Sequence, residues 1–355
     1  MAPARQGANL TAIAAALGVS VATVSNALSG KGRVSAELTE RIRLKADEVG
    51  YIPSSAGRAL RTGRTGVLGL VLPDITNPLF PEIAQGVEKA AVAAGYGLLI
   101  ADSHGEISQQ TEAINRLIER GVDGMVIIPR RGTRIGAVDC PVAVVDSPST
   151  PGNTVAADHW DGGMQLGRYL TNLGHRKVVL VGKSSESNVQ NDRLGGVRAG
   201  MHPSSIVETL WIDQVERHHG KDCALGLCER VAAGVTAFAA ASDLHALRVM
   251  AELQRGGISV PEQASVTGFD DLLWAPLITP ALTTMRMDIP KIAELAISAL
   301  TRVIDGGDEV SLPASGGVAA DVSKVPMKLV VRSSTAPAAS INNSHNYPAG
   351  ELHPC

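Results

Sequence analysis

Four polar residues of this sequence each follow an apolar run of strand-like composition. They are Asp158, Arg193, Ser242 and Asp270. In open α/β folds, ligands bind beyond the carboxyl ends of the strands. A carboxylate or a guanidinium can bind two hydroxyl groups at once, and an aromatic side chain such as Phe80 can stack on the face of a sugar ring. These residue types predict a cleft for a small polyhydroxyl ligand.

A second set of polar residues lies near the N-terminus and has a different chemistry. Ser20, Thr23, Ser25 and Asn26 fall at the start of a short predicted helix, two residues after a turn at Gly18. Hydroxyl groups and a helix N-terminus suit phosphate oxygens. The second helix of a helix-turn-helix lies in the major groove of DNA with its start near phosphates and base edges. This spacing therefore predicts a DNA-binding head.

The charge distribution agrees with a polyanion-binding head. Residues 1–65 carry nine Lys or Arg and four Asp or Glu, a net charge of +5. The whole chain has a net charge of −3, so the remainder carries −8. A basic head on an acidic body is typical of a nucleic-acid-binding module joined to another domain. Chance clustering of solvated charges remains the alternative on charge alone.

No enzymatic or metal-binding motif was found. The run VGKSS at 181–185 ends like a phosphate-binding P-loop, but Lys177 occupies the place of its first glycine. His218, His219, Cys223 and Cys228 have no standard zinc spacing. No nucleophile lies near a candidate base. We therefore expect neither catalysis nor a metal or cofactor.

Composition limits the class of protein. The 355 residues are 45% hydrophobic and 19% charged, which allows two or three domains with buried cores. No apolar run reaches the roughly 18–20 residues that span a bilayer, and the N-terminus does not resemble a secretory signal. Four cysteines do not suggest a disulfide framework. These features predict a soluble cytoplasmic protein.

Periodicity predicts the elements that position these residues. Helices are expected first at 10–17, 21–28 and 36–49. From Val67 onward, apolar strands alternate with amphipathic helices. The expected strands are 67–72, 97–101, 124–129, 142–146, 177–182, 236–242 and 264–269, and the expected helices are 81–94, 109–120, 160–173, 192–201, 221–233, 243–256 and 290–304. Such alternation is typical of doubly wound parallel sheets covered on both faces.

Several stretches resemble the LacI/GalR family of bacterial transcription regulators. They include GVSVATVSNALSGKGRVS (18–35), EVGYIPSSAGRALRTGRTGVLGLVLPDITNPLFPEI (48–83), VAADHWDGGMQLGRYLTNLGHRKVVLVG (155–182), ASDLHAL (241–247), ASVTGFDD (264–271) and ALTTMRMD (281–288). The resemblance extends from about Asn9 to Ala336, and the order and spacing of these stretches are more specific than any single motif.

The resemblance implies a helix-turn-helix head and a two-lobed core similar to a periplasmic binding protein. The implied divisions are the DNA-binding domain at 1–50, a hinge helix or linker at 51–65, an effector-binding and dimerisation domain at 66–337, and a disordered tail at 338–355. Lobe 1 would comprise about 66–158 and 287–313, and lobe 2 about 159–286 and 314–335. The tail has no leucine heptads, which disfavours a coiled-coil tetramer.

The resemblance also implies which residues bind DNA. They are Ser20, Val21, Ala22, Thr23, Ser25, Asn26, Arg33, Tyr51, Ser54, Gly57 and Leu60. Leu60 falls where the family inserts a leucine into a base step. Gly57 replaces a usual alanine, which predicts a hinge that is harder to fold.

For the effector, the implied contacts are Asn77, Phe80, Asp158, Trp160, Arg193, Ser242, Asp270, Trp274 and Ile289. We therefore expect a homodimeric regulator that binds double-stranded operator DNA, most simply a repressor released by a sugar-like effector. The alternative is a corepressor-dependent repressor or an activator that responds to a sugar phosphate or a nucleoside. A transport protein with the same core would need export, and it would not explain the N-terminal helices.

Overall fold

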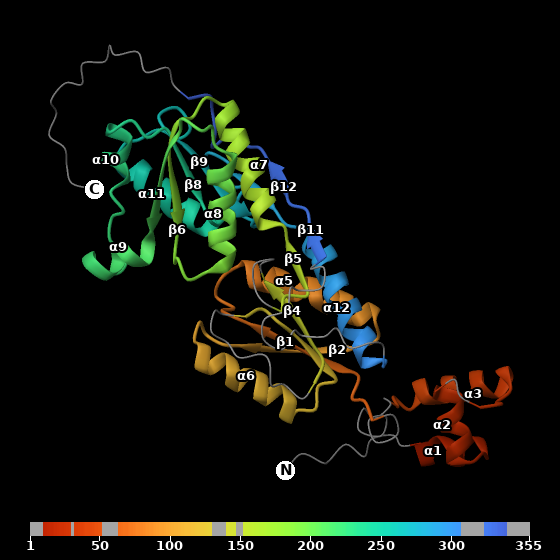
Figure 1. Cartoon of the computed structure of the whole chain (residues 1–355). Coiled ribbons are helices and arrows are strands. Elements are labelled where there is room, and N and C mark those ends of the chain that lie inside the picture. Colours follow the sequence, from red (N-terminus) through yellow and green to blue (C-terminus); the bar gives the residue numbers. More distant parts are fainter. Residues whose placement is uncertain are drawn as a thin grey trace. The chain divides into compact units, whose positions relative to one another are not determined.

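The computed structural model describes residues 10–29, 32–51, 63–129, 140–146, 152–306 and 323–338. The chain separates into two compact units, Met1–Thr65 and Gly66–Cys355, and each is described here by itself (Figure 1).

The first unit is a three-helix bundle. Its helices are α1 (Leu10–Leu17), α2 (Val21–Ser29) and α3 (Ala36–Glu48), which confirms the predicted helices to within one residue at each end. Ile13, Val24 and Ile42 are fully buried at its centre because apolar side chains recur at helical spacing in all three segments. Within the described residues no single helix is long and apolar enough to cross a bilayer. The pair α1 and α2 passes on length and composition together, but it is bent by 107°.

The second unit contains two six-stranded sheets. The first sheet has the order β11-β5-β4-β3-β1-β2, and the second has the order β12-β10-β9-β8-β6-β7. All pairings in the first sheet are parallel, and only β12 is antiparallel in the second. The strands are β1 (Val67–Leu72), β2 (Gly97–Asp102), β3 (Gly124–Ile127), β4 (Val142–Asp146), β5 (Val155–Ala157), β6 (Lys177–Gly182), β7 (Ile206–Trp211), β8 (Ala237–Ala240), β9 (Ser265–Asp270), β10 (Thr283–Arg286), β11 (Ser323–Val325) and β12 (Lys328–Val330).

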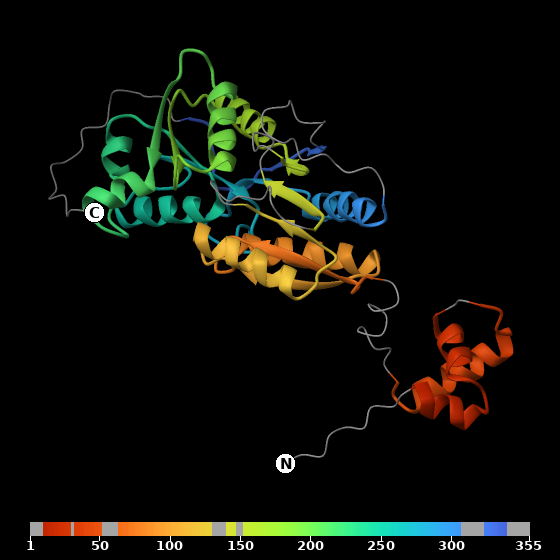
Figure 2. The ribbon, with the colours of Figure 1, turned by 60° about the horizontal axis from the view of Figure 1, so that its bottom comes forward.

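Helices cover these sheets, as expected for parallel strands joined by crossovers. They are α5 (Leu79–Ala93), α6 (Ile107–Glu119), α7 (His159–Asn172), α8 (Asn188–Gly200), α9 (Ile212–His219), α10 (Leu227–Ala232), α11 (Asp243–Arg255) and α12 (Ile289–Ile304). Figure 2 shows α12 (blue) beside α5 (orange), although about 200 residues separate them in the chain. The first lobe is therefore built from segments distant in sequence.

The chain passes between the two lobes three times. It crosses from β5 to α7, returns from β10 to α12, and crosses again from β11 to β12. The last crossover lies later than predicted. Residues 314–335 were assigned to lobe 2, but β11 pairs with β5 in the first sheet, so the chain changes lobes between Val325 and Lys328. The expected tail from 339 onward lies outside the described residues.

Helices α7 and α8 pack with almost no side chain between them. Glycines face each other at the crossing, and a Cβ atom added to Gly163 would lie 2.2 Å from the carbonyl oxygen of Arg193. A Cβ on Gly196 would lie 2.1 Å from the carbonyl oxygen of Trp160. Only glycine permits this approach, which brings the start of α7 against the first turns of α8.

Candidate functional site

A cavity of about 690 Å³ opens at the carboxyl ends of strands from both sheets of the second unit. From the first sheet, residues that follow β1 and β3 and residues at the end of β4 line it, among them Asp74, Pro129 and Asp146. From the second sheet, residues following β6 and β8 and at the end of β9 line it, among them Lys183, Ser242 and Asp270. This is the position that open α/β sheets use for ligands.

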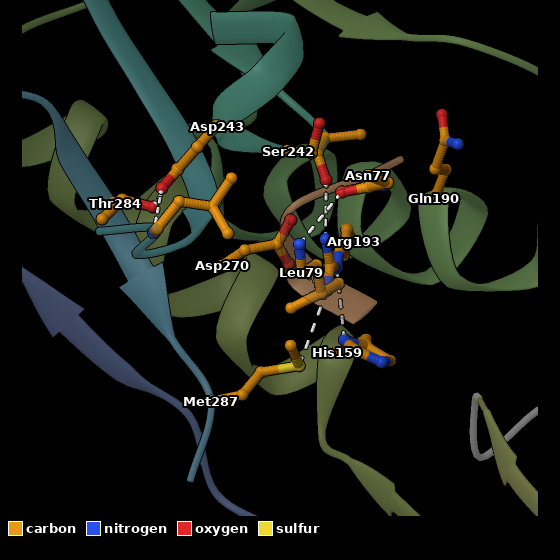
Figure 3. A network of polar contacts seen from close by, with 12 residues as sticks. Asn77, Leu79, His159, Gln190, Arg193, Ser242, Asp243, Asp270, Thr284 and Met287 are labelled. Atoms are coloured by element: carbon orange, nitrogen blue, oxygen red, sulfur yellow. Dashed lines mark hydrogen bonds and ion pairs between the residues drawn. The ribbon is translucent and has the colours of Figure 1, made fainter. Parts of the chain in front are cut away.

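Arg193 contacts several neighbours in the wall of the cavity (Figure 3). It lies in the second turn of α8 and is only 3% exposed. Its Nη2 lies 2.8 Å from Oδ1 of Asp270, and its Nη1 donates to the carbonyl oxygen of Ala241 at 2.8 Å. The guanidinium also lies over the ring of Phe269, 5.0 Å from the centroid. Arg193 is thus fixed against the ends of β8 and β9.

Asp270 is held in an unusual backbone conformation at the end of β9. Its φ is 107°, a region that favours glycine, and its side chain is buried. Burial raises the pKa of Asp270, while the neighbouring charge of Arg193 acts in the opposite direction. Oδ1 of Asp270 is fully buried and is paired with the guanidinium of Arg193. The pair therefore places one positive and one negative group in the wall of the cavity.

His159 contacts Arg193 from the start of α7. Its Nδ1 accepts a hydrogen bond from Nε of Arg193 at 3.3 Å, and the ring is buried. Burial holds the pKa of His159 well below its usual value, and the charge of Arg193 lowers it further, against a hydrogen bond with the backbone of Asp146. The imidazole is consequently neutral at physiological pH.

Ser242 and Asp243 begin α11 but have different roles. Ser242 caps the helix, accepting a hydrogen bond from the His245 amide at 3.3 Å, and it also lines the cavity. Asp243, the first residue of α11, is fully buried. Its carboxylate accepts hydrogen bonds from the Leu272 amide at 2.8 Å and the Thr284 hydroxyl at 2.5 Å. Asp243 therefore fixes the loop that follows β9.

Asp243 makes stability depend on pH. Burial, and next the charge of Asp270, raises the pKa of Asp243 to about 8. Between about pH 5 and 8 the folded state retains a proton at Asp243 that the unfolded state has lost, so the contribution of Asp243 to the free energy of unfolding should fall as pH rises, by up to about 1.4 kcal/mol per pH unit. Urea unfolding of the wild type and of Asp243→Asn at half-unit steps checks this. Asp243→Asn should remove this contribution, and a slope that is the same in both proteins would contradict the assignment.

At lower pH the buried histidines have the opposite effect, because they make the free energy of unfolding rise as pH rises. Burial, followed by the charge of Lys183, lowers the pKa of His245 to about 4, and the pKa of His159 is lowered as well. As pH falls below about 6.5, the histidines bind protons in the unfolded state but not in the folded state, which lowers the free energy of unfolding. At pH 6.5 an unfolded histidine is still half protonated, so this opposite contribution disappears only by about pH 7.5. The difference between the wild type and Asp243→Asn therefore isolates the Asp243 carboxyl group.

The structure brings six of the nine predicted effector residues to the cavity. These are Asn77, Phe80, Arg193, Ser242, Asp270 and Ile289. The other three do not line it. Asp158 instead caps α7, accepting from the Asp161 amide at 3.2 Å. Trp160 is 47% exposed and lies against Gly195 of α8, and Trp274 packs against the core clusters.

Other cavity residues were missed from the sequence. His159, Lys183, Gln190, His245 and Met287 all line the cavity. Gln190 and Lys183 lie near strand ends, which could have identified them, and His159 adjoins the predicted Asp158. Met287 carries no sequence signal because an isolated methionine is typical of a core. Among the described residues, no cluster of three or more His, Cys, Asp or Glu could hold a metal ion.

In the first unit, helix α2 presents the predicted DNA contacts at its start. Ser20 caps it, accepting from the Thr23 amide at 3.0 Å. Val21 is 41% exposed although apolar, and Ala22 and Asn26 are exposed as well. Among the remaining predictions, Ser25 is half-buried, Arg33 is exposed, Tyr51 packs against the bundle core, and Ser54, Gly57 and Leu60 lie outside the described residues.

Comparison with known proteins identifies both units. Residues 9–54 match the family described as bacterial regulatory proteins, lacI family, and residues 168–335 match the periplasmic binding protein-like domain. The HTH-type transcriptional regulator AscG of Escherichia coli is 31% identical over 316 residues, which cover 83% of this chain and 92% of AscG. DegA of Bacillus subtilis, also an HTH-type transcriptional regulator, is 28% identical over 92% of this chain and 97% of its own length.

Solved structures share the fold. A lac repressor dimer bound to operator and the anti-inducer ONPF superposes with a TM-score of 0.74 at 22% identity, covering 93% of this chain and all of that one. A LacI-family regulator from Enterococcus faecium with bound ribose superposes with a TM-score of 0.61 at 23% identity, covering 77% of this chain and all of the other. The chain belongs to the LacI family of bacterial regulatory proteins, which are helix-turn-helix transcriptional regulators that bind DNA.

Proposed function

We propose that this protein is a homodimeric transcriptional repressor that a sugar-like effector releases from its operator. The observation that carries the proposal is the Arg193–Asp270 pair, which presents a buried cation and a buried carboxylate to one cavity in a chain that also carries a DNA-reading helix. Effector binding would change the relative orientation of the two lobes and so the spacing of the two DNA-binding heads. The coupling is reciprocal, so effector and operator weaken each other's binding by the same factor.

Helix α2 supports sequence-specific reading of DNA. Val21 and Ala22 are exposed and apolar, so they suit contact with thymine methyl groups. Asn26 is exposed one turn further along the helix and can bond bidentately to adenine. Ser20 and Thr23 at the helix start suit phosphate oxygens. Leu60 is proposed as the residue that inserts into a base step, as the family resemblance implies.

The cavity supports a polyhydroxyl effector. Carboxylates of Asp270, Asp146 and Asp74 line it together with the amides of Asn77 and Gln190. Such groups hydrogen-bond hydroxyls in pairs, and Phe80 in the wall offers an aromatic ring. The Enterococcus faecium regulator of the same fold binds ribose.

Lys183 favours the second candidate, a corepressor-dependent repressor or activator that responds to a sugar phosphate or a nucleoside. Lys183 is exposed and lines the cavity where α8 begins, and an ammonium group close to a helix N-terminus suits a phosphate. A corepressor would raise operator affinity, whereas an inducer would lower it. The sign of the change in operator affinity therefore separates the two candidates.

Exposed apolar residues support the homodimer. Leu99 and Ile100 are 37% and 48% exposed on β2, the edge strand of the first sheet. Leu273 and Leu277, in the segment after β9, are 87% and 75% exposed. A second copy of the chain could bury these side chains. Two heads on a symmetric dimer would read a pseudo-palindromic operator.

We propose that the protein binds DNA in the cytoplasm and that it does not catalyse a reaction of its effector.

Operator selection from genomic fragments followed by a salt titration tests the DNA-binding assignment. We expect a footprint with two symmetric half-sites and a steep fall in affinity between about 50 and 200 mM salt, because each phosphate contact contributes about 0.9 to the log–log slope. Arg33→Ala should reduce the slope by about 1, whereas the matched control Arg255→Ala in α11 should not. A flat slope would contradict the proposed phosphate contacts.

The effector class is tested on the same operator. D-ribose and D-ribose 5-phosphate are added in parallel, and calorimetry measures their binding to the free protein. A sugar-type inducer should lower operator affinity. The phosphate as the stronger ligand, with a rise in operator affinity, would favour the second candidate.

A further inference from the structure

The guanidinium of Arg193 contacts side chains at two of the three crossovers between the lobes. His159 begins α7 directly after the first crossover, and Met287 lies in the second, between β10 and α12. Nε of Arg193 donates to Nδ1 of His159 at 3.3 Å, and its Nη2 lies 3.7 Å from Sδ of Met287 (Figure 3). A cavity residue of the second lobe is thus joined to the segments that set the lobe orientation.

His159 has a partner on each side of its ring. Nδ1 faces Arg193 as an acceptor, so the ring proton must lie on Nε2. The ring also hydrogen-bonds the backbone of Asp146, the last residue of β4 in the first sheet. The ring is 3% exposed, so it cannot exchange these partners for water without a local rearrangement. One imidazole therefore bridges the first sheet and helix α8.

We infer that His159 is a positioning residue that holds the Arg193 guanidinium toward the cavity and ties it to β4 of the first sheet. The inference rests on the proposed function only in taking Arg193 as an effector contact. Through this bridge, a ligand that moves the guanidinium also moves the Asp146 end of the first sheet, and a change in lobe orientation displaces the guanidinium.

The chemistry requires a neutral imidazole. An imidazolium would present an N–H to the N–H of Arg193, and the two like charges would repel in a buried site. Lysine or arginine at 159 could not accept the bond from Nε. The packing of α7 on α8 holds the ring in place, because Gly163 allows the helices to approach within backbone contact directly beyond His159.

Three substitutions separate the two halves of the bridge. His159→Asn keeps an acceptor close to the position of Nδ1 but cannot reach Asp146. His159→Gln extends to the position of Nε2 and can donate to Asp146, but it offers Arg193 no acceptor at Nδ1. His159→Phe keeps the ring shape and loses both bonds. The two amides are therefore complementary partial rescues, and the phenylalanine is the full loss.

NMR of the deuterated, ¹⁵N- and ¹³C-labelled full chain provides the test. The two signals followed are Nε–H of Arg193, assigned by its absence in Arg193→Lys, and the carbonyl carbon of Asp146. In the wild type we expect an unprotonated Nδ1 and a slowly exchanging Arg193 Nε–H. In His159→Phe the Nε–H exchange rate should rise about tenfold or more and the Asp146 carbonyl signal should move.

The two amide variants, His159→Asn and His159→Gln, test each half of the bridge separately. His159→Asn should restore slow exchange at Arg193 alone, and His159→Gln should restore the Asp146 carbonyl shift alone. Unchanged Arg193 and Asp146 signals in His159→Phe, or equal behaviour of the two amide variants, would overturn the bridge. If His159→Phe does not fold, the two amide variants still provide the comparison. None of these signals depends on DNA or sugar binding, so failure here is distinguishable from failure of the proposed function.

Discussion

Replacing Arg193 with methionine should lower the free energy of unfolding of the second unit by about 3–5 kcal/mol, because it leaves the Asp270 carboxylate buried without its cation. Methionine retains much of the side-chain volume, so the cost reports charge and hydrogen bonding more than a cavity. The carbonyl oxygen of Ala241 also loses the donor that now lies at 2.8 Å. Denaturant unfolding monitored by circular dichroism measures the change.

A double-mutant cycle identifies the source of this loss. Asp270→Asn in the Arg193→Met background should recover a substantial part of the stability, since it removes the uncompensated charge. The cost of Arg193→Met should also grow with pH, because burial already raises the pKa of Asp270 and a protonated carboxyl tolerates the loss of its cation. A cost that is independent of both Asp270 and pH would show that Arg193 acts through packing alone.

Replacing Gly163 with alanine should lower the free energy of unfolding by about 3 kcal/mol. The new Cβ would lie 2.2 Å from the carbonyl oxygen of Arg193 and 2.8 Å from the amide nitrogen of Val197. Both are backbone atoms in the middle of α8, so the two helices must separate. Separation also moves His159 away from Arg193 and so should alter the cavity.

Gly97→Ala is the matched control for this substitution. Gly97 lies in β2, has an ordinary backbone conformation, and its nearest new contact would be 3.9 Å away. We expect a change of well under 1 kcal/mol there, since the new Cβ makes only ordinary van der Waals contacts and alanine lowers the conformational entropy of the unfolded chain. Similar unfolding midpoints for the two variants in urea would show that α7 and α8 can move apart at little cost.

The sequence predicted the continuously apolar strands well, and it did not predict strands that are very short or interrupted by polar residues. The bounds of β1, β4 and β6 coincide with the predicted runs because these strands are continuously apolar. The edge strand β7 was not predicted, since Glu208 and Thr209 interrupt its apolar pattern. The strands β11 and β12 have three residues each, too few to produce a periodicity.

One expected helix was wrong. Residues 221–233 were predicted as a single helix, but the structure has α9 at Ile212–His219 and α10 at Leu227–Ala232. Gly220 ends α9 with a φ of 91°, and Gly226 precedes α10 with a φ of 70°. Glycines in this left-handed region end helices, and in this segment they outweigh the helical pattern.

The site was predictable to the extent that strand ends define it. Arg193, Ser242 and Asp270 follow from the rule for carboxyl ends of parallel strands. Trp160 was predicted at the effector site, but helical rotation turns it toward α8 and solvent, while its neighbour His159 turns inward. Which of two adjacent residues faces the cavity depends on the α7–α8 crossing, which involves residues about 30 positions apart.

The three crossovers mean that neither lobe is a contiguous stretch of chain. During synthesis, the first sheet lacks its edge strand β11 until residues 323–325 have left the ribosome, and α12 is made only after most of the second lobe. The second sheet in turn waits for residues 328–330. A nascent chain truncated before about residue 290 would therefore contain no finished lobe, so completion of both lobes depends on the stretch from α12 to β12, residues 289–330.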